Sequence, residues 1–502
     1  MPRAAFQSWG CRLPVDARHP EYENALPDWR RNRDVVEGER AVKAAGYLPR
    51  LAKQSDSEYA AMKDRAYFFP ATSRTLDGLT GLIFRKDPQA ELPAAIKAYT
   101  DDINLQGQSI AEFAQKITDD IMQAPHGGIL VEYPRTDGAE LVKAAAEAMG
   151  LRPYATFYPA EKVINWRTSR VSNRMVITEV RLLESVEEAD PKDPWGRVTV
   201  EQIRVLALNE AGVYEVAIFQ KRRNEATAKT DWVEADRFVP YFRGAPSRDI
   251  PFVFIGPRDT SSEVQKAPLT DISGVNIGHY RNSADYENGL HWTGCPTPVF
   301  LGDLISGTGE QVTEVRIGST SGIQMSQGSD AKFLEFEGSG LSALKTALDD
   351  KKTDMALLGA RILASDRKQT EAAETAAIHR AGENSVLASL AGSVSKGIEK
   401  ALQIMAAWVG VDGAQISYRL NTDYQPAAMS FNDLSAIVGA WQSGAISKIE
   451  LFESLQAGEI IRDDKAYDEH AAELEAEEAA RDEGDEEALA AAAARVVSRG
   501  AQ

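Results

Sequence analysis

The sequence PLTDISGVNIGHYRNSADYENGLH, residues 268–291, predicts a helix whose first turn is capped by Thr270 or Asp271. The chain before it has a different character. Residues 197–208 (RVTVEQIRVLAL) and 212–220 (GVYEVAIFQ) are β-branched runs that flank a turn, which predicts a hairpin. Further strands are predicted at 175–183, 231–242 and 251–255. Because these strands follow one another without intervening helices, they favour antiparallel pairing and an α+β fold.

The region after this helix predicts long helices. No proline lies between Pro298 and Pro426, although the chain holds 22 prolines. Apolar residues recur at helical spacing over 341–362 and again over 387–409. A polar connector, ASDRKQTEAAET at 364–375, separates the two helices.

The N-terminal hundred residues also predict helices. Their pattern indicates helices over 28–45, 57–67 and 73–84, with a break at Tyr47-Leu48-Pro49. The segment 184–195 is rich in Pro, Asp and Ser and is predicted to be a loop.

Composition and charge narrow the class of protein. Acidic residues outnumber basic ones 75 to 56, which disfavours a broad basic surface that grips duplex DNA. Thirteen of the acids lie in 463–487, so this tail is predicted to be a solvated helix, with a role in repelling DNA or meeting a partner as the alternative. Apolar runs are too short to span a membrane, and no signal peptide is evident. Two cysteines, Cys11 and Cys295, are too few for a disulfide framework.

Catalytic and nucleotide-binding motifs are defective. The segment GLSALKT at 340–346 has Leu344 where a phosphate-binding loop needs glycine, and GTGEQV at 307–312 lacks the third glycine of a dinucleotide fingerprint. The six histidines lack the spacing of a zinc site. Asp349, Asp350 and Asp354 alternate with lysines, which is typical of a solvated helix face. We therefore expect no enzyme activity, no cofactor and no metal.

Three segments together resemble the portal (head-to-tail connector) proteins of tailed bacteriophages, in the branch catalogued as a domain of unknown function. The resemblance covers most of the chain in order. The first segment carries Trp29, Arg33, Asp34, Gly38, Val42, Lys43, Tyr47-Leu48-Pro49, Tyr59, Arg65-Ala66-Tyr67-Phe68, Arg74-Thr75, Gly78-Leu79, Gly81 and Phe84. The second carries Leu269, Asp271, Ile272, Asn276, His279-Tyr280-Arg281, Ser283, Asp285-Tyr286 and Pro296-Thr297-Pro298. The third comprises 355–363 (MALLGARIL), 370–375 and Glu383-Asn384-Ser385.

The resemblance implies a fold and a domain order. Portal subunits form rings, usually of twelve, around a channel for double-stranded DNA. They have long wing and stem helices, antiparallel strands in the wing, a small β-containing clip and a helical crown. The implied segments are a helical then β N-terminal wing at 1–195, a β-rich part including the clip at 196–262, the stem helix at 263–293, a wing with long helices at 294–425 with a channel loop near 364–375, and a crown with an acidic tail at 426–502.

The same resemblance implies function and partners. The ring would sit at one capsid vertex of the virion, after assembly in the host cytoplasm, and pass DNA inward during packaging and outward during ejection. Its partners would be further copies of the chain, double-stranded phage DNA without sequence reading, the terminase, the major capsid and scaffolding proteins, and head-completion adaptor or tail proteins. No membrane is implied. An acidic wall suits a channel, because it repels the DNA backbone.

The implied domain order also predicts which residues would contact DNA and which would contact a neighbouring subunit. Arg361, Arg367 and Lys368 would contact DNA if the connector at 364–375 faces the channel; surface charges or salt bridges between subunits are the alternative. Tyr280, Tyr286 and Trp292 would anchor the contact with a neighbouring subunit, or belong to the core of their own chain. Two rival functions stay open: a ring-forming scaffold or capsid-completion protein, and a packaging nuclease or ATPase.

Overall fold

The structure of the chain is a computed structural model. It describes residues 14–473 with the exception of 135–148, 172, 191–192, 194, 224–229, 243–244, 295–296, 302–324, 326, 335–337, 364–385, 423, 425–430, 444, 458–459 and 462–464. The chain contains both helices and strands, and the strands pair in antiparallel sheets. This confirms the predicted α+β class. The chain divides into two compact units, Met1–Thr422 and Asp423–Gln502.

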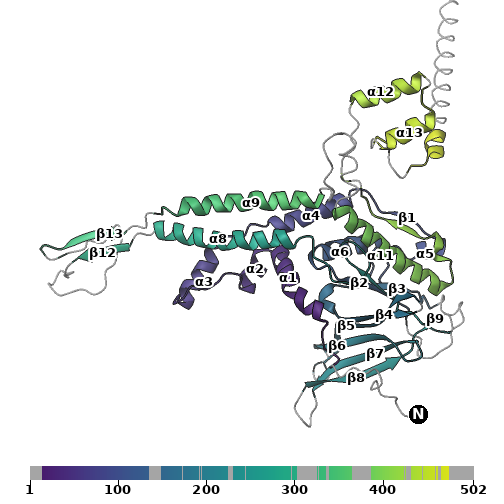
Figure 1. Ribbon diagram of the computed structural model, residues 1–502, viewed down its shortest axis with the longest axis horizontal. Coiled ribbons are helices and arrows are strands. Elements are labelled where there is room, and N and C mark those ends of the chain that lie inside the picture. Colours follow the sequence, from purple (N-terminus) through teal and green to yellow (C-terminus); the bar gives the residue numbers. More distant parts are fainter. Residues whose placement is uncertain are drawn as a thin grey trace, which may run out of the picture. The chain divides into compact units, whose positions relative to one another are not determined.

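The first unit contains a five-stranded antiparallel sheet, drawn at the bottom of Figure 1. Its strands, in spatial order, are β4 (Val163–Val171), β5 (Arg174–Ala189), β6 (Arg197–Leu208), β7 (Tyr214–Arg223) and β8 (Thr230–Phe238). The predicted hairpin is confirmed, because Leu208 pairs with Tyr214 around a turn in which Asn209 Oδ1 accepts the amides of Ala211 and Val213, both at 3.0 Å. Gly212 supplies the positive φ of 69° that this turn needs.

The prediction of a loop over 184–195 is wrong for its first half. β5 continues to Ala189, which pairs with Arg197, so the ladder with β6 extends beyond the core into residues that are mostly exposed. A domain boundary between 195 and 196 therefore falls inside one sheet. The strands described over 196–262 belong mainly to this large sheet.

A three-stranded sheet packs beside the large one. It has the order β11 (Phe252–Ile255), β2 (Gly127–Glu132) and β3 (Tyr154–Tyr158). Two glycines open β2 because aromatic rings leave no room for a side chain: a Cβ at Gly128 would lie 2.2 Å from the Phe252 ring, and one at Gly127 would lie 2.7 Å from that of Phe157. The Gly-Gly pair after His126 thus serves packing.

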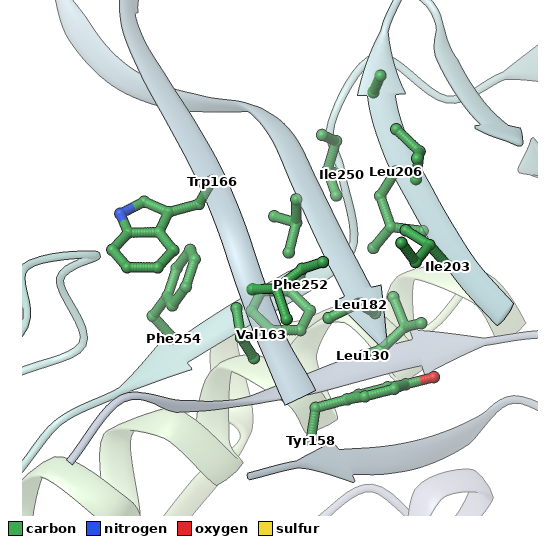
Figure 2. Close-up of a cluster of buried hydrophobic side chains, with 14 of the residues drawn as sticks. Leu130, Tyr158, Val163, Trp166, Leu182, Ile203, Leu206, Ile250, Phe252 and Phe254 are labelled. Carbon is green, nitrogen blue, oxygen red and sulfur yellow. The ribbon is translucent and has the colours of Figure 1, made fainter. Parts of the chain in front are cut away.

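The main apolar core lies between these two sheets. Figure 2 shows Trp166 and Phe254 next to each other, and Phe252 and Leu182 deeper in the same cluster. His126 lies in this core, 1% exposed, with its ring centroid 4.0 Å from that of Trp166. Its Nε2 has no hydrogen-bond partner, and burial lowers the pKa of His126 to about 3.

Replacing His126 with phenylalanine is expected to flatten the pH dependence of stability. The unfolded chain binds a proton at this residue near pH 6.5, whereas the folded chain does so only near pH 3. The free energy of unfolding should thus fall as the pH drops below 6.5, by up to about 1.4 kcal/mol per unit from His126 alone. Urea unfolding of both proteins at pH 7 and pH 5 measures the difference, and equal losses in the two would contradict it.

Four helices open the chain. They are α1 (Pro20–Glu37), α2 (Glu39–Ala45), α3 (Asp56–Arg65) and α4 (Ala71–Ile83). The predicted helices are confirmed, but the first begins eight residues earlier than expected, because His19 accepts the Glu21 amide as an N-cap and Pro20 fits the first turn. It also divides at Gly38, whose φ of 105° interrupts the helix. Short elements follow: β1 (Gln89–Glu91), α5 (Ala94–Lys97) and α6 (Ile110–Gln123).

Three long helices dominate the rest of the first unit. They are α8 (Thr270–Gly294), α9 (Leu341–Leu363) and α11 (Val386–Val409), which confirms the predicted helices at 268–291, 341–362 and 387–409. α11 packs on α6 and the three-stranded sheet, and Gly397 permits this, since a Cβ there would lie 2.6 Å from Ile255. α8 and α9 run side by side, with the two-stranded sheet of β12 (Thr297–Leu301) and β13 (Asp330–Leu334) between them in sequence (Figure 1). The remaining strands are β9 (Tyr241–Phe242), β10 (Ala245–Pro246) and β14 (Ser417–Arg419).

The second unit contains α12 (Phe431–Gln442) and α13 (Lys448–Ala457). Phe452 is its apolar centre, 5% exposed, and its ring packs on those of Tyr467 and His470. Most of the acidic tail, including everything after 473, lies outside the described residues. Among the helices described, none is long and apolar enough to cross a membrane.

Candidate assembly site on the helical hairpin

Helices α8 and α9 form a helical hairpin, whose outer end carries the sheet of β12 and β13. The other half of α8, its N-terminal or inner half, is bound to the N-terminal segments of the chain. Asn276 is fully buried; its Oδ1 accepts hydrogen bonds from the amide and hydroxyl of Thr72 at 3.2 and 2.9 Å, and its Nδ2 donates to the Phe69 carbonyl at 2.9 Å. Two turns of helix further on, Ser283 Oγ accepts the Tyr67 amide at 3.2 Å. These bonds join segments about 200 residues apart in sequence, so the N-terminal third of the chain fixes the direction of α8.

Tyr280 lies in the centre of this joint. It is 0% exposed, packs edge-on against Phe68 with ring centroids 6.0 Å apart, and shares an apolar cluster with Val42 and Leu48. Its hydroxyl has no hydrogen-bond partner, and burial raises its pKa to about 12. The structure therefore places Tyr280 in the core of its own chain, the alternative that its sequence pattern left open.

The contact between α8 and α9 relies on close approach. Gly289 faces Leu341, and a Cβ at Gly289 would lie 2.6 Å from that side chain. Near the inner end His279 is 2% exposed, and neither of its ring nitrogens has a hydrogen-bond partner. Burial, together with the nearby charges of Lys352 and Lys351, lowers the pKa of His279 to about 4. His279 is thus a neutral packing residue at pH 7.

The outer end of the hairpin is apolar and exposed. Leu290 and Trp292 at the end of α8 are 39% and 51% exposed, and the Trp292 ring contacts only His291 among the ring contacts of the described residues. On the two-stranded sheet the exposed apolar side chains are Leu301 at 52%, Phe333 at 60% and Leu334 at 67%. We refer to these five residues as the hairpin-end patch. Among the described residues, neither of the two buried apolar clusters packs against these five side chains.

The other predicted interface residues behave differently from Tyr280. Trp292 belongs to the hairpin-end patch, and Tyr286 is half-buried on α8. Leu301, Phe333 and Leu334 were not predicted; the alternating run AKFLEFE at 331–337 is the signal that could have indicated a strand there. The small sheet of β12 and β13 follows α8 in the chain.

Of the three cations predicted to line the channel, the structure describes the position of one. Arg361 lies in the last turn of α9. Arg367 and Lys368, with the rest of the connector at 364–375, lie outside the described residues. In the part of the chain that the structure describes, no group of three or more His, Cys, Asp or Glu side chains is arranged to hold a metal ion.

A buried ionic network joins the two sheets away from this site. Arg204 on β6 lies between Glu132 on β2 and Glu184 on β5, and it pairs with both, at 2.9 Å from Glu184 Oε1. Burial raises the pKa of Glu132, while Arg204 opposes that change. Since each charged group has its partner, the network holds the sheets together and needs no ligand.

One family model matches part of the chain. Residues 268–409, from just before α8 to the end of α11, match a family described as a domain of unknown function, DUF4055. The predicted resemblance to a family catalogued in this way is confirmed over that segment. No curated protein matches the sequence significantly.

Solved structures of phage-like particles are also similar. The chain shares 13% identity with a chain of the "Virion of native gene transfer agent (GTA) particle", with a TM-score of 0.39, over 82% of this chain and 96% of that one. It shares 13% identity with a chain of the "Neck of native GTA particle computed with C12 symmetry", with a TM-score of 0.39, over 83% and 98%. For the "Neck of empty GTA particle computed with C6 symmetry" the values are 14%, 0.38, 83% and 97%.

Proposed function

We propose that this chain is a portal-like ring subunit and that double-stranded DNA passes through the centre of the ring. The observation that carries this proposal is the hairpin-end patch. A two-stranded sheet is at best marginally stable alone in water. Large apolar side chains are exposed at the end of α8 and on both faces of this sheet, because the neighbouring residues Phe333 and Leu334 point to opposite faces, and exposed apolar surface on this scale supports a contact with other protein. Neighbouring copies of the hairpin in a ring would cover the patch.

The residues that carry the portal resemblance support the same proposal. Thr72 and Tyr67 lie in or beside the first resembling segment, and Asn276 and Ser283 belong to the second. In the structure they bond to one another. The residues of the two resembling segments therefore pack against each other in one place. This contact fixes the direction of α8, which carries the hairpin-end patch at its far end.

The negative net charge of the chain is consistent with a channel that does not bind DNA tightly. The chain carries a net charge of −19, and each phosphate bound by Lys or Arg would add affinity and therefore friction. We propose that Arg361, Arg367 and Lys368 supply brief cationic contacts inside an otherwise repelling channel. The chain would act without enzymatic activity, as part of a virion vertex that docks the terminase and later the head-completion or tail proteins.

Electron microscopy of the purified full-length protein tests the proposal. Closed rings with a central hole wider than a DNA duplex are the expected result. Rings without such a hole would favour a scaffold or capsid-completion protein. Hydrolysis of ATP, or Mg²⁺-dependent cutting of DNA, by the same preparation would instead favour an enzyme of DNA packaging. Rings without a hole, or either enzymatic activity, would contradict the proposal that the ring conducts DNA.

A further inference from the structure

Arg33 on α1 lies between two carboxylates from other parts of the chain. Its Nη2 pairs with Asp120 Oδ2 on α6, and its Nε donates to Glu161 Oε1 on the short helix η2 (Ala160–Lys162) at 2.9 Å. Nη2 also donates to Glu161 Oε2, at 3.2 Å. We refer to these three residues as the Arg33 triad. Because two carboxylates share one guanidinium, the triad carries one excess negative charge when both are ionised.

Asp120 is the less favourably placed of the two acids. Its side chain is 12% exposed, against 27% for that of Glu161. Its Oδ1 is buried and has no hydrogen-bond partner among the described residues. An ionised carboxylate with a buried, unpaired oxygen is costly, and a proton on Oδ1 removes that cost. Burial, opposed by Arg33 and assisted by Glu161, raises the pKa of Asp120 to about 7.

The other charged groups near Asp120 do not balance the excess charge. Lys116, one turn earlier on α6, is exposed, so solvent weakens its effect on Asp120. Asp119 faces α4 instead, where Thr80 donates to its Oδ1 and Asp77 lies nearby. Strand β2 and helix α11 also pack on α6, but their charged side chains contact other groups or solvent: Glu132 contacts Arg204, Glu399 the Tyr418 amide and Lys400 Thr260, and Lys396 is exposed.

A groove of about 530 Å³ lies beside the triad. Its lining includes Arg33, Lys116, Asp120, Phe157 and Pro159. A groove of this size admits water, so Asp120 can exchange a proton with solvent while the chain stays folded.

The same part of α1 also holds the first turn of α8. Asn32, next to Arg33, is 0% exposed. Its Nδ2 donates to the Gln123 carbonyl at 2.8 Å and to Thr270 Oγ1 at 3.3 Å, and its Oδ1 accepts from Ser273 Oγ at 2.5 Å. A change in the contact between α1 and α6 should therefore be felt at the start of α8.

We propose that the Arg33 triad makes the contact between α1 and α6 sensitive to pH. With a proton on Asp120 the contact is tight, and loss of that proton above neutral pH loosens α1 and the first turn of α8. An aspartate in the unfolded chain loses its proton near pH 3.8. The stabilisation by Asp120 is thus complete below that pH and is lost as the pH rises through about 7. This inference does not depend on the proposed ring.

Urea unfolding of the full-length wild type and of Asp120→Asn, at pH 5.5 and pH 8.5, tests the sign. Asparagine keeps an oxygen that can accept from Arg33 and resembles the protonated acid. The wild-type unfolding constant, divided by that of the variant, should rise about tenfold or more between the two pH values, because each pH unit below the folded pKa counts for about tenfold. His126 acts on both proteins equally, so the ratio excludes its contribution.

Two further variants make this test specific. Glu161→Gln should move the pH-dependent change to lower pH, because it leaves Arg33 to Asp120 alone. Asp28→Asn is the matched control, since Asp28 is an exposed carboxylate on α1 that pairs with Arg31 at 2.9 Å. Its ratio to the wild type should stay constant between pH 5.5 and pH 8.5.

Amide hydrogen exchange locates the effect in the chain. After correction for the intrinsic pH dependence of exchange, α1 and the first turn of α8 should exchange faster at pH 8.5 than at pH 5.5 in the wild type but not in Asp120→Asn. A variant that is less stable than the wild type by the same factor at both pH values would show that Asp120 only pairs with Arg33, and would overturn the inference. A changing ratio without faster exchange in α1 would overturn the loosening of that helix.

Discussion

Replacing Trp292 with glutamate is expected to abolish assembly at concentrations where the wild-type protein forms rings. Trp292 is half exposed in the hairpin-end patch, and tryptophans buried at an interface typically contribute about 2–4 kcal/mol to binding. Since each 1.4 kcal/mol is a tenfold change, the concentration for half-assembly should rise by about two orders of magnitude. A glutamate adds the cost of desolvating a charge. Sedimentation velocity over a concentration series measures the shift.

Tyr241→Glu is the matched control for this variant. Tyr241 is 62% exposed and lies on β9, away from the hairpin. It should leave the assembly midpoint within about threefold of wild type, in line with the small effects typical of surface substitutions. If the Trp292 and Tyr241 variants had the same assembly midpoint, the hairpin-end patch would not be part of the contact between subunits.

Tyr280→Ala is expected to cost about 3–5 kcal/mol of folding free energy, as aromatic-to-alanine changes in a core do. The ring is fully buried against Phe68, and the N-terminal helices would lose their contact with α8. Chemical unfolding, at a concentration low enough to keep the protein monomeric, measures this loss.

Tyr280→Phe separates packing from polarity at the same position. The hydroxyl is buried without a hydrogen-bond partner, so its removal should leave stability unchanged or raise it by up to about 1 kcal/mol. Assembly of this variant should equal that of the wild type. A phenylalanine variant that folds normally but does not assemble would show that Tyr280 acts between subunits after all.

Local patterns predicted the elements of this fold well. Helical spacing and the absence of proline correctly located α8, α9 and α11, because these signals depend only on neighbouring residues. β5 was predicted too short, since its outer half is polar on both faces and carries no burial signal. The small sheet of β12 and β13 was missed because its strands are only five residues long and all the residues of β13 are exposed.

The candidate site was less predictable than the fold. Tyr280 and Trp292 lie on one helix and are both aromatic, yet one is buried inside the chain and the other is exposed. Sequence spacing cannot distinguish burial within a chain from burial between chains. The distinction came from the partners of α8, since α3 and Phe68 cover Tyr280, whereas Trp292 is left 51% exposed.

Assembly mass tests the central claim most directly. Native mass spectrometry of the purified full-length protein should show a closed oligomer near twelve times the subunit mass of 54.8 kDa, in equilibrium with free subunits. A protein that remains a monomer or dimer across a wide range of concentration and salt would contradict the ring. In that case the exposed apolar patch at the end of the hairpin would need a different partner.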